Sequence, residues 1–76
     1  SPSYFSSVFS KEMGKTFIEY LTEVRMEKAK QYLACSSMKT SEISYEVGYK
    51  DPHYFSYIFK KTQGCTPKEY RAARKG

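Results

Sequence analysis

The sequence predicts an all-α fold, a bundle of short helices, and three observations support that prediction. Residues that cap helix N-termini precede most of the apolar stretches, and glycines that can end a helix follow them. No stretch alternates apolar and polar residues before a hairpin turn, as a half-buried strand would. A segment near the N-terminus also recurs later in the 76-residue chain, which indicates that one helical unit is used twice.

We expect five helices, near residues 2–13, 17–35, 42–47, 52–63 and 67–74. Two start with a proline after a capping residue, and two start with a capping box in which threonine and glutamate satisfy each other's backbone N–H groups. These starts are Ser1-Pro2, Asp51-Pro52, Thr16 to Glu19 and Thr66 to Glu69. Gly14, Gly48 and Gly64 are the expected helix ends, because glycine adopts the left-handed conformation without a Cβ clash.

The repeat relates the start of the chain to the fourth expected helix at a constant offset of 50 positions. Identical residues stand 50 positions later for Pro2, Tyr4, Phe5, Ser6, Phe9, Lys11, Gly14, Thr16, Glu19 and Tyr20. In the first copy, helical spacing predicts an apolar side of Phe5, Val8 and Phe9 and an outward side of Ser3, Ser7 and Ser10.

The long second helix is amphipathic, and we expect it to be a scaffold that joins the two copies. Its predicted core stripe is Phe17, Tyr20, Leu21, Val24 and Tyr32, with Ala29 and Leu33 at the edge.

The third and fourth helices are joined tightly, as in a helix-turn-helix. Ser41 is the expected N-cap of a short helix that carries Ile43 and Val47 and ends at Gly48. Three residues separate Gly48 from the start of the fourth helix at Pro52. Two helices joined by a short turn with glycine are the helix-turn-helix pattern, although many bundles contain such a hairpin.

The fourth helix has two distinct faces. At 100° per residue, the expected core side is Phe55, Ile58, Phe59 and Thr62. His53, Tyr57 and Lys60 point the other way, flanked by Ser56 and Lys61. Such side chains suit a major groove, where ring nitrogens and hydroxyls meet base edges and lysines meet phosphates. The alternative is an ordinary solvated face.

Charge supports an anionic partner. Of the net charge of +5, residues 1–49 contribute nothing, since six basic and six acidic side chains cancel there. The excess lies in residues 50–76 and points to a polyanion or to a basic tail. No apolar run approaches the roughly 18 residues of a membrane span. No leader of the secretory kind and no initiator methionine are present, so we expect a piece of a longer protein.

Catalysis, metal binding and cofactor binding are not expected. Asp51 and His53 stand two positions apart, which would put them on different sides of a helix, so they do not form a triad with a nearby serine. No glycine-rich phosphate loop occurs, and one histidine with two cysteines falls short of a four-ligand zinc site. Cys35 and Cys65 are expected to be free thiols rather than one disulfide.

These motifs resemble the C-terminal DNA-binding domain of the AraC/XylS transcription regulators. The similarity runs from A-K-Q-Y-L at residues 29–33 through the stretch S-E-I-S-Y-E-V-G-Y-K-D-P-H-Y-F to the end of P-K-E-Y-R at residue 71. The residues that carry it are Ile43, Gly48-Tyr49, Tyr54-Phe55, Phe59-Lys60-Lys61, Gly64 and Pro67 to Arg71. Ser44 stands where the family favours alanine, and Tyr49 where it favours phenylalanine.

The resemblance implies a homeodomain-like bundle of two helix-turn-helix motifs joined by a long linker helix. Residues 1–14 would then be the recognition helix of a partial first motif, residues 15–36 the linker helix, and residues 37–76 the complete second motif with a C-terminal helix. The implied function is sequence-specific binding of double-stranded DNA as the output domain of a bacterial-type transcription regulator, with the helices near 2–13 and 52–63 in the major groove.

The resemblance also implies particular contacts. Base-reading positions fall on Ser3, Ser6, Ser7, His53, Tyr54 and Tyr57, of which helical projection alone selects His53 and Tyr57 and leaves Ser6 and Tyr54 nearer the flank. The phosphate candidates are Lys11, Ser41, Lys60 and Lys61, together with the amides that begin the short third helix.

Two alternatives stay open. The aromatic face of the 52–63 helix could instead dock a protein partner, in which case binding would depend little on salt. RNA is the weaker alternative, because no aromatic strand platform is expected. For a DNA-binding regulator the resemblance implies a cytoplasmic location, a companion sensor or receiver domain outside this chain, and RNA polymerase as a further candidate partner, without a membrane.

Overall fold

The computed structural model describes residues 11–74 and is all-helical over that range, which confirms the predicted fold class. Its complete helices are α2 (Phe17–Cys35), α3 (Thr40–Glu46), α4 (Pro52–Gln63) and α5 (Pro67–Arg74). Residues 11–13 are also helical, whereas the rest of the expected first helix lies outside the described residues. The predicted bounds of α2, α4 and α5 are confirmed.

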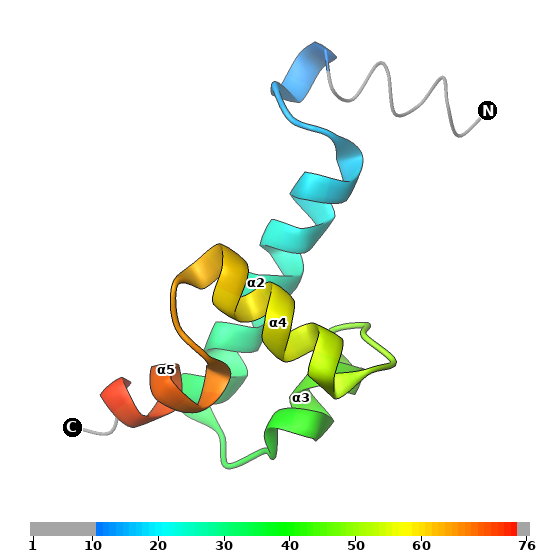
Figure 1. Ribbon diagram of the computed structural model, residues 1–76. Helices are drawn as coiled ribbons and strands as arrows, with labels where there is room; N and C mark the ends of the chain where they lie inside the picture. The colour runs from blue at the N-terminus through cyan, green and yellow to red at the C-terminus, as the bar shows by residue number, and fades with distance from the viewer. Residues whose placement is uncertain (1–10, 75–76) are drawn as a thin grey trace.

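The arrangement is asymmetric along α2. The helices α3, α4 and α5 gather around the C-terminal half of α2, and its first turns extend beyond them (Figure 1). Contacts join α2 to α3 and α5, and α4 to α3 and α5. The C-terminal half of α2 is therefore the scaffold on which the helix-turn-helix rests.

Both predicted capping boxes are present. The Thr16 N–H donates to Glu19 Oε1 at 2.9 Å, and the Glu19 N–H donates to Thr16 Oγ1 at 3.0 Å. At the start of α5, the Thr66 N–H donates to Glu69 Oε1 at 2.8 Å and the Glu69 N–H donates to Thr66 Oγ1 at 3.0 Å. Two backbone donors that the helix cannot satisfy are thus satisfied at each start.

The start of α3 differs from the prediction. The helix begins at Thr40 with Lys39 as the N-cap, so Ser41 lies inside the first turn and is not the cap. Glu42 Oε1 accepts the Lys39 N–H at 2.9 Å. Because that carboxylate satisfies the backbone N–H at the N-cap, the helix starts without a serine cap.

The turn between α3 and α4 is closed by backbone hydrogen bonds. The Gly48 N–H donates to Tyr45 O at 3.1 Å, and the Tyr49 N–H donates to Ser44 O at 2.9 Å. These are the two bonds of a Schellman motif, which needs a left-handed residue at the position of Gly48, where φ is 107°. At the other side of the turn, Asp51 Oδ1 accepts the His53 N–H at 2.9 Å and caps α4.

The core joins α2, α3, α4 and the turn. Its buried members are Met26, Ala29, Leu33, Ile43, Val47, Tyr49, Phe55 and Phe59. The rings of Phe55 and Phe59 lie 5.9 Å apart, and Tyr70 of α5 meets Phe59 edge-on at 5.8 Å. The predicted core side of α4 is confirmed for Phe55 and Phe59, with Ile58 packed partly against them.

Thr62 is exposed, contrary to the prediction. It lines a groove of about 610 Å³ between α2 and α4 together with Ile18 and Thr22. Its hydroxyl donates to Ile58 O at 2.8 Å. Thr62 thus lies on the side of α4 that faces α2, at the edge of the core rather than inside it.

The predicted core stripe of α2 is displaced: Ala29 and Leu33, expected at its edge, are buried and Tyr32 packs against the core, but the prediction is wrong for Tyr20 and Val24. The buried residues are Met26, Ala29 and Leu33, whereas Tyr20 and Val24 are 38% and 39% exposed. At 100° per residue, Tyr20 and Val24 lie on nearly the opposite side from Met26 and Leu33. Both sides of α2 carry apolar residues, so the spacing alone did not show which side α3, α4 and α5 would cover.

The end of α2 is held by α5. Arg71 Nε donates to Leu33 O at 3.1 Å, and one of its terminal nitrogens donates to Ser36 O at 3.1 Å. These carbonyls lie at the helix end and lack intrahelical partners. Arg71 therefore satisfies the C-terminus of α2 and fixes α5 against it.

Candidate nucleic-acid interface

The outward side of α4 is formed by His53, Tyr54, Tyr57, Lys60 and Lys61, here called the reading face. All five are exposed, with Tyr54 and Tyr57 at 52% and 57%. Phe55 and Phe59, on the other side of the same helix, are fully buried. Burial of these two phenylalanines fixes the rotation of α4 and so determines which side chains point outward.

The aromatic residues of the reading face contact one another. The Tyr54 and Tyr57 rings lie 6.3 Å apart, and the Lys61 ammonium lies 5.7 Å from the Tyr57 centroid. Within residues 11–74, neither phenol hydroxyl makes a hydrogen bond, so both can bind a ligand. A surface of rings with polar tips next to ammonium groups can contact base edges and phosphates at once.

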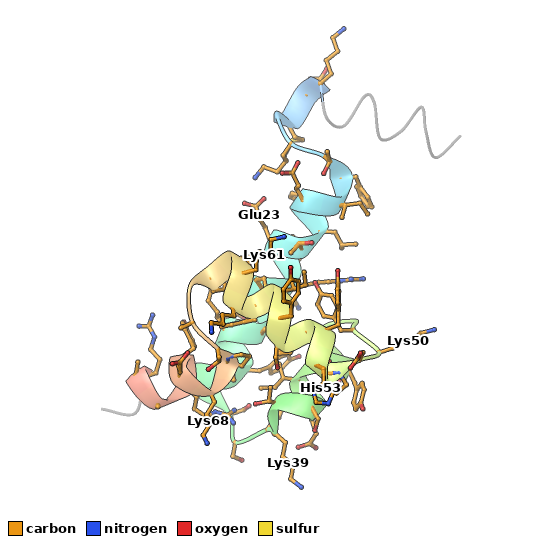
Figure 2. The ribbon with its side chains drawn as sticks, in the orientation of Figure 1. Glu23, Lys39, Lys50, His53, Lys61 and Lys68 are labelled. Atoms are coloured by element: carbon orange, nitrogen blue, oxygen red, sulfur yellow. The ribbon has the colours of Figure 1, made fainter. Side chains whose placement is uncertain are left out.

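Basic groups lie at both ends of the reading face. Figure 2 shows Lys50 and His53 beside the N-terminal end of α4 and Lys61 beside its C-terminal end. Glu23 lines the same groove as Lys61 but pairs with Lys15. In the part of the chain that the structure describes, Lys61 has no ion pair, so its charge is available to an anion.

Part of the positive charge of residues 50–76 is used internally. Arg71 binds the carbonyls at the end of α2, and Arg74 stacks on Tyr70 with 4.8 Å from its guanidinium carbon to the ring centroid. Lys68 lies near the start of α5, away from Lys61 (Figure 2). The net charge of this segment therefore overstates the charge that the reading face offers to a ligand.

The remaining predicted contact residues lie elsewhere. Lys11 is exposed at the start of the described residues, and Ser41 is partly buried in the first turn of α3. Ser3, Ser6 and Ser7 lie outside the described residues. The structure thus brings together the predicted contacts of α4 and leaves the others as predictions.

Two residues near the reading face were not selected from the sequence. Ser44 is fully buried, and its hydroxyl donates to Tyr49 O at 3.3 Å, across the turn. Arg25 of α2 places its guanidinium 5.0 Å from the Tyr49 ring centroid. The serine at position 44, where the family favours alanine, was a signal for Ser44. Nothing in the spacing of α2 distinguished Arg25 from the other charged residues of that helix.

Other chemistry has little support within residues 11–74. Asp51 contacts the backbone N–H of His53 rather than its ring, as a helix cap. No three His, Cys, Asp or Glu side chains come together there, and Cys35 and Cys65 are free. None of the helices in this range is apolar over a length that could cross a bilayer.

A tight helical hairpin with an exposed, aromatic and basic second helix defines a helix-turn-helix domain. Residues 1–73 match a family model described as a helix-turn-helix domain, and together with the relatives below this match identifies the AraC type of that domain. The chain belongs to this family, and the resemblance predicted from its motifs is confirmed.

Curated relatives include transcription regulators that are much longer. YesN, a transcriptional regulatory protein of Bacillus subtilis, is 42% identical over 78 residues, which cover 100% of this chain and 21% of YesN. The arabinose operon regulatory protein of Salmonella typhimurium is 35% identical over 72 residues, which cover 95% of this chain and 26% of that protein. The chain thus spans about a fifth to a quarter of these relatives.

Solved structures share the fold. The C-terminal domain of AraT, a response regulator from Geobacillus stearothermophilus, has a TM-score of 0.94 and 44% identity, covering 97% of this chain and 61% of that one. The DNA-binding domain of AdpA, solved in complex with a target DNA, has a TM-score of 0.89 and 26% identity, covering 96% and 66%.

Proposed function

We propose that this chain binds double-stranded DNA sequence-specifically as the output domain of a transcription regulator, with α4 in the major groove. The observation that carries the proposal is the reading face, in which one helix turns two tyrosines, a histidine and two lysines outward from a buried aromatic core. The AdpA domain, which has the same fold, was solved on a target DNA and supports the choice of ligand.

Within α4 the side chains divide by chemistry. His53 and Tyr57 carry ring nitrogens and a hydroxyl that can hydrogen-bond base edges, and Tyr54 supplies a ring at the flank. Lys60 and Lys61 carry point charges suited to phosphates. Phosphate contacts position the helix and base contacts specify the sequence, so the two groups should respond differently to mutation.

The first copy of the repeat supplies the second proposed contact. Ser3, Ser6 and Ser7 would face bases, and Lys11 would face a phosphate. Ser41 and the amides at the start of α3 are further phosphate candidates. Two recognition helices on one linker reach the same face of the duplex about 10 base pairs apart, so the site should be two unlike patches without a palindrome.

The first test is the salt dependence of binding. If about four to six phosphates are neutralised, log K falls against log salt with a slope near −4 to −5. Fluorescence anisotropy on labelled duplex DNA measures that slope. A slope near zero would instead favour a helical bundle that docks a protein partner through the aromatic reading face.

The second test separates readers from positioning charges. His53→Ala and Tyr57→Phe should each change base preference, by roughly 1–3 kcal/mol per lost contact. Lys60→Ala is the matched control on the same helix, and it should weaken all duplexes about equally. Uniform weakening by His53→Ala would remove that residue from the set of readers.

The companion domain is also a proposal. Because the chain spans only part of its relatives, a sensor or receiver domain belongs to the same regulator. Relatives at 44% and 45% identity are C-terminal domains of response regulators, which favours a receiver. Chromosomal DNA as the target places the regulator in the cytoplasm, with RNA polymerase as a candidate partner there. Phosphorylation of the intact regulator that changes its DNA affinity would support the receiver.

A further inference from the structure

A continuous series of side-chain contacts links α2 to the reading face, and we call it the ladder. Its members in order are Arg25, Tyr49, Tyr54, Tyr57 and Lys61. The Arg25 guanidinium lies 5.0 Å from the Tyr49 centroid, and the Tyr49 and Tyr54 centroids lie 6.0 Å apart. The ladder begins on the linker helix, passes through the two tyrosines that point outward from α4, and ends at Lys61.

Arg25 fits closely against the turn of the helix-turn-helix. A Cβ atom added at Gly48 would lie 3.1 to 3.2 Å from three atoms of the Arg25 guanidinium group. Within residues 11–74, Arg25 makes no hydrogen bond or ion pair, so no acidic partner accounts for its position. The guanidinium lies over the open face of Gly48 and the Tyr49 ring.

Tyr49 is held from several sides. It is 9% exposed, and its ring lies 5.7 Å from that of buried Phe55. Its backbone is bound twice to Ser44, through the N–H at 2.9 Å and the carbonyl at 3.3 Å. Arg25 covers a remaining side of the ring. With Arg25 in place, Tyr49 is a fixed surface against which Tyr54 lies.

We propose that Arg25 is a positioning residue for base recognition, which acts on Tyr54 and Tyr57 through Tyr49 without touching DNA. The inference rests on the proposed function, in which α4 reads bases. An exposed tyrosine loses rotamer entropy when it is ordered on a ligand, and a side chain already ordered loses less. Removing the support of Tyr49 should therefore weaken the contacts that depend on Tyr54 and Tyr57.

The planar guanidinium is the part of Arg25 that matters. Arginine stacks on aromatic rings through its plane, whereas lysine carries a compact and strongly hydrated charge. Arg25→Lys keeps the charge and removes the plane, so it distinguishes positioning from a phosphate contact. Lys28→Ala is the matched control, since Lys28 is exposed on the same helix and makes no hydrogen bond or ion pair within the described residues.

The experiment uses the intact regulator that carries this chain and a duplex selected by the wild type from a randomised library. Affinities are measured for that duplex, for its single-base-pair variants and for poly(dI-dC), each over a range of salt. The comparison uses those base-pair positions at which Tyr57→Phe or Tyr54→Ala changes the discrimination between bases. Arg25→Lys should reduce discrimination at those positions about tenfold, as for one weakened base contact.

Two binding measurements should not change with Arg25→Lys, whereas the environment of the tyrosine rings should. Affinity for poly(dI-dC) and the salt slope should stay as in the wild type, and Lys28→Ala should keep full discrimination. Ring NMR shifts of Tyr54 and Tyr57 in the free protein should move in Arg25→Lys and not in Lys28→Ala. Because the ring shifts are measured without DNA, the Arg25→Lys comparison still tests positioning if a second variant, Arg25→Ala, proves too unstable for binding measurements.

The outcomes that would overturn the inference are distinct. Full discrimination and unchanged ring shifts in Arg25→Lys would show that the ladder does not position the readers. A salt slope that falls by about 1 in Arg25→Ala and recovers in Arg25→Lys would make Arg25 a phosphate contact. Failure of the wild type to select any duplex would instead reject the proposed function itself.

Discussion

The two halves of α2 are held in place by different interactions. In the second half, Met26, Ala29 and Leu33 are almost completely buried against the other helices. In the first half, Ile18 is 68% exposed and the capping box at Thr16 begins the helix. The capping box thus supplies a local signal that starts the helix, and burial of the described residues anchors it further along.

This difference matters for the proposed reading face. The buried half of α2 carries the core residues that fix the rotation of α4, and Arg25 stands at the junction between the halves. We therefore expect the effect of a mutation to depend on the half of α2 that it affects and on the kind of interaction that it removes.

The largest effect is expected where α4 packs on the buried half. Phe59 is fully buried between Phe55 and Tyr70. Phe59→Ala should cost roughly 3–5 kcal/mol in unfolding free energy, because it leaves a cavity in the centre of the core. Urea denaturation followed by circular dichroism measures the loss, which is large for a domain of this size. A loss below about 1 kcal/mol would mean that the site collapses or is not central.

The second prediction compares the halves directly. Leu33→Ala should cost about 2–5 kcal/mol, whereas Ile18→Ala should stay within about 0.5 kcal/mol because Ile18 is largely exposed. Both variants are measured by the same denaturation experiment. Equal losses would show that the first half of α2 is packed by residues outside the described range, and would remove the contrast between the halves.

The third prediction concerns the end of the buried half. Arg71→Ala removes the hydrogen bonds to Leu33 O and Ser36 O, and it should cost about 1–3 kcal/mol because these carbonyls then lose their charged donor. Arg71→Lys is the control, since lysine keeps a positive charge near the helix C-terminus without the fork of donors. A lysine variant as stable as the wild type would assign the effect to charge alone.

The fourth prediction concerns the capping boxes, which have the same geometry in two settings. Thr16→Ala and Thr66→Ala should each cost about 0.5–2 kcal/mol. We expect the larger loss at Thr66, because the helix that it caps carries Tyr70 against Phe59 and Arg71 against the end of α2. Amide hydrogen exchange at the first turns of α2 and α5 compares the two variants.

The smallest effect is a dependence on pH. The Thr16 backbone N–H and hydroxyl lower the pKa of Glu19 below its usual value of 4.5, and Thr66 lowers the pKa of Glu69 in the same way. Since the folded pKa is depressed, this stabilisation is present above pH 4.5 and is lost as the pH falls through the folded values. The double variant Glu19→Gln and Glu69→Gln should therefore lose less stability between pH 6 and pH 3 than the wild type, and the difference should be small because both carboxylates are exposed. Equal losses would show that the two carboxylates contribute nothing.

The sequence by itself determined the features that depend on neighbouring residues. The starts of α2, α4 and α5 follow from capping residues within four positions of each start, and Gly48 marks the turn because that position needs a positive φ. The two faces of α4 also followed from the sequence, since one side is aromatic and the other polar. Such local rules led to His53 and Tyr57.

Only the tertiary structure determined the features that depend on which helix surfaces pack together. Apolar residues occur on both sides of α2, so burial of Met26 rather than Val24 was determined by where the other helices pack. Thr62 stayed exposed for the same reason. Arg25 contacts Tyr49, which lies 24 positions further along the chain, and Arg71 binds Leu33 O, which lies 38 positions back. No periodicity within one helix encodes a contact between distant segments, because side-chain spacing specifies a direction from the helix axis and not the partner that lies there.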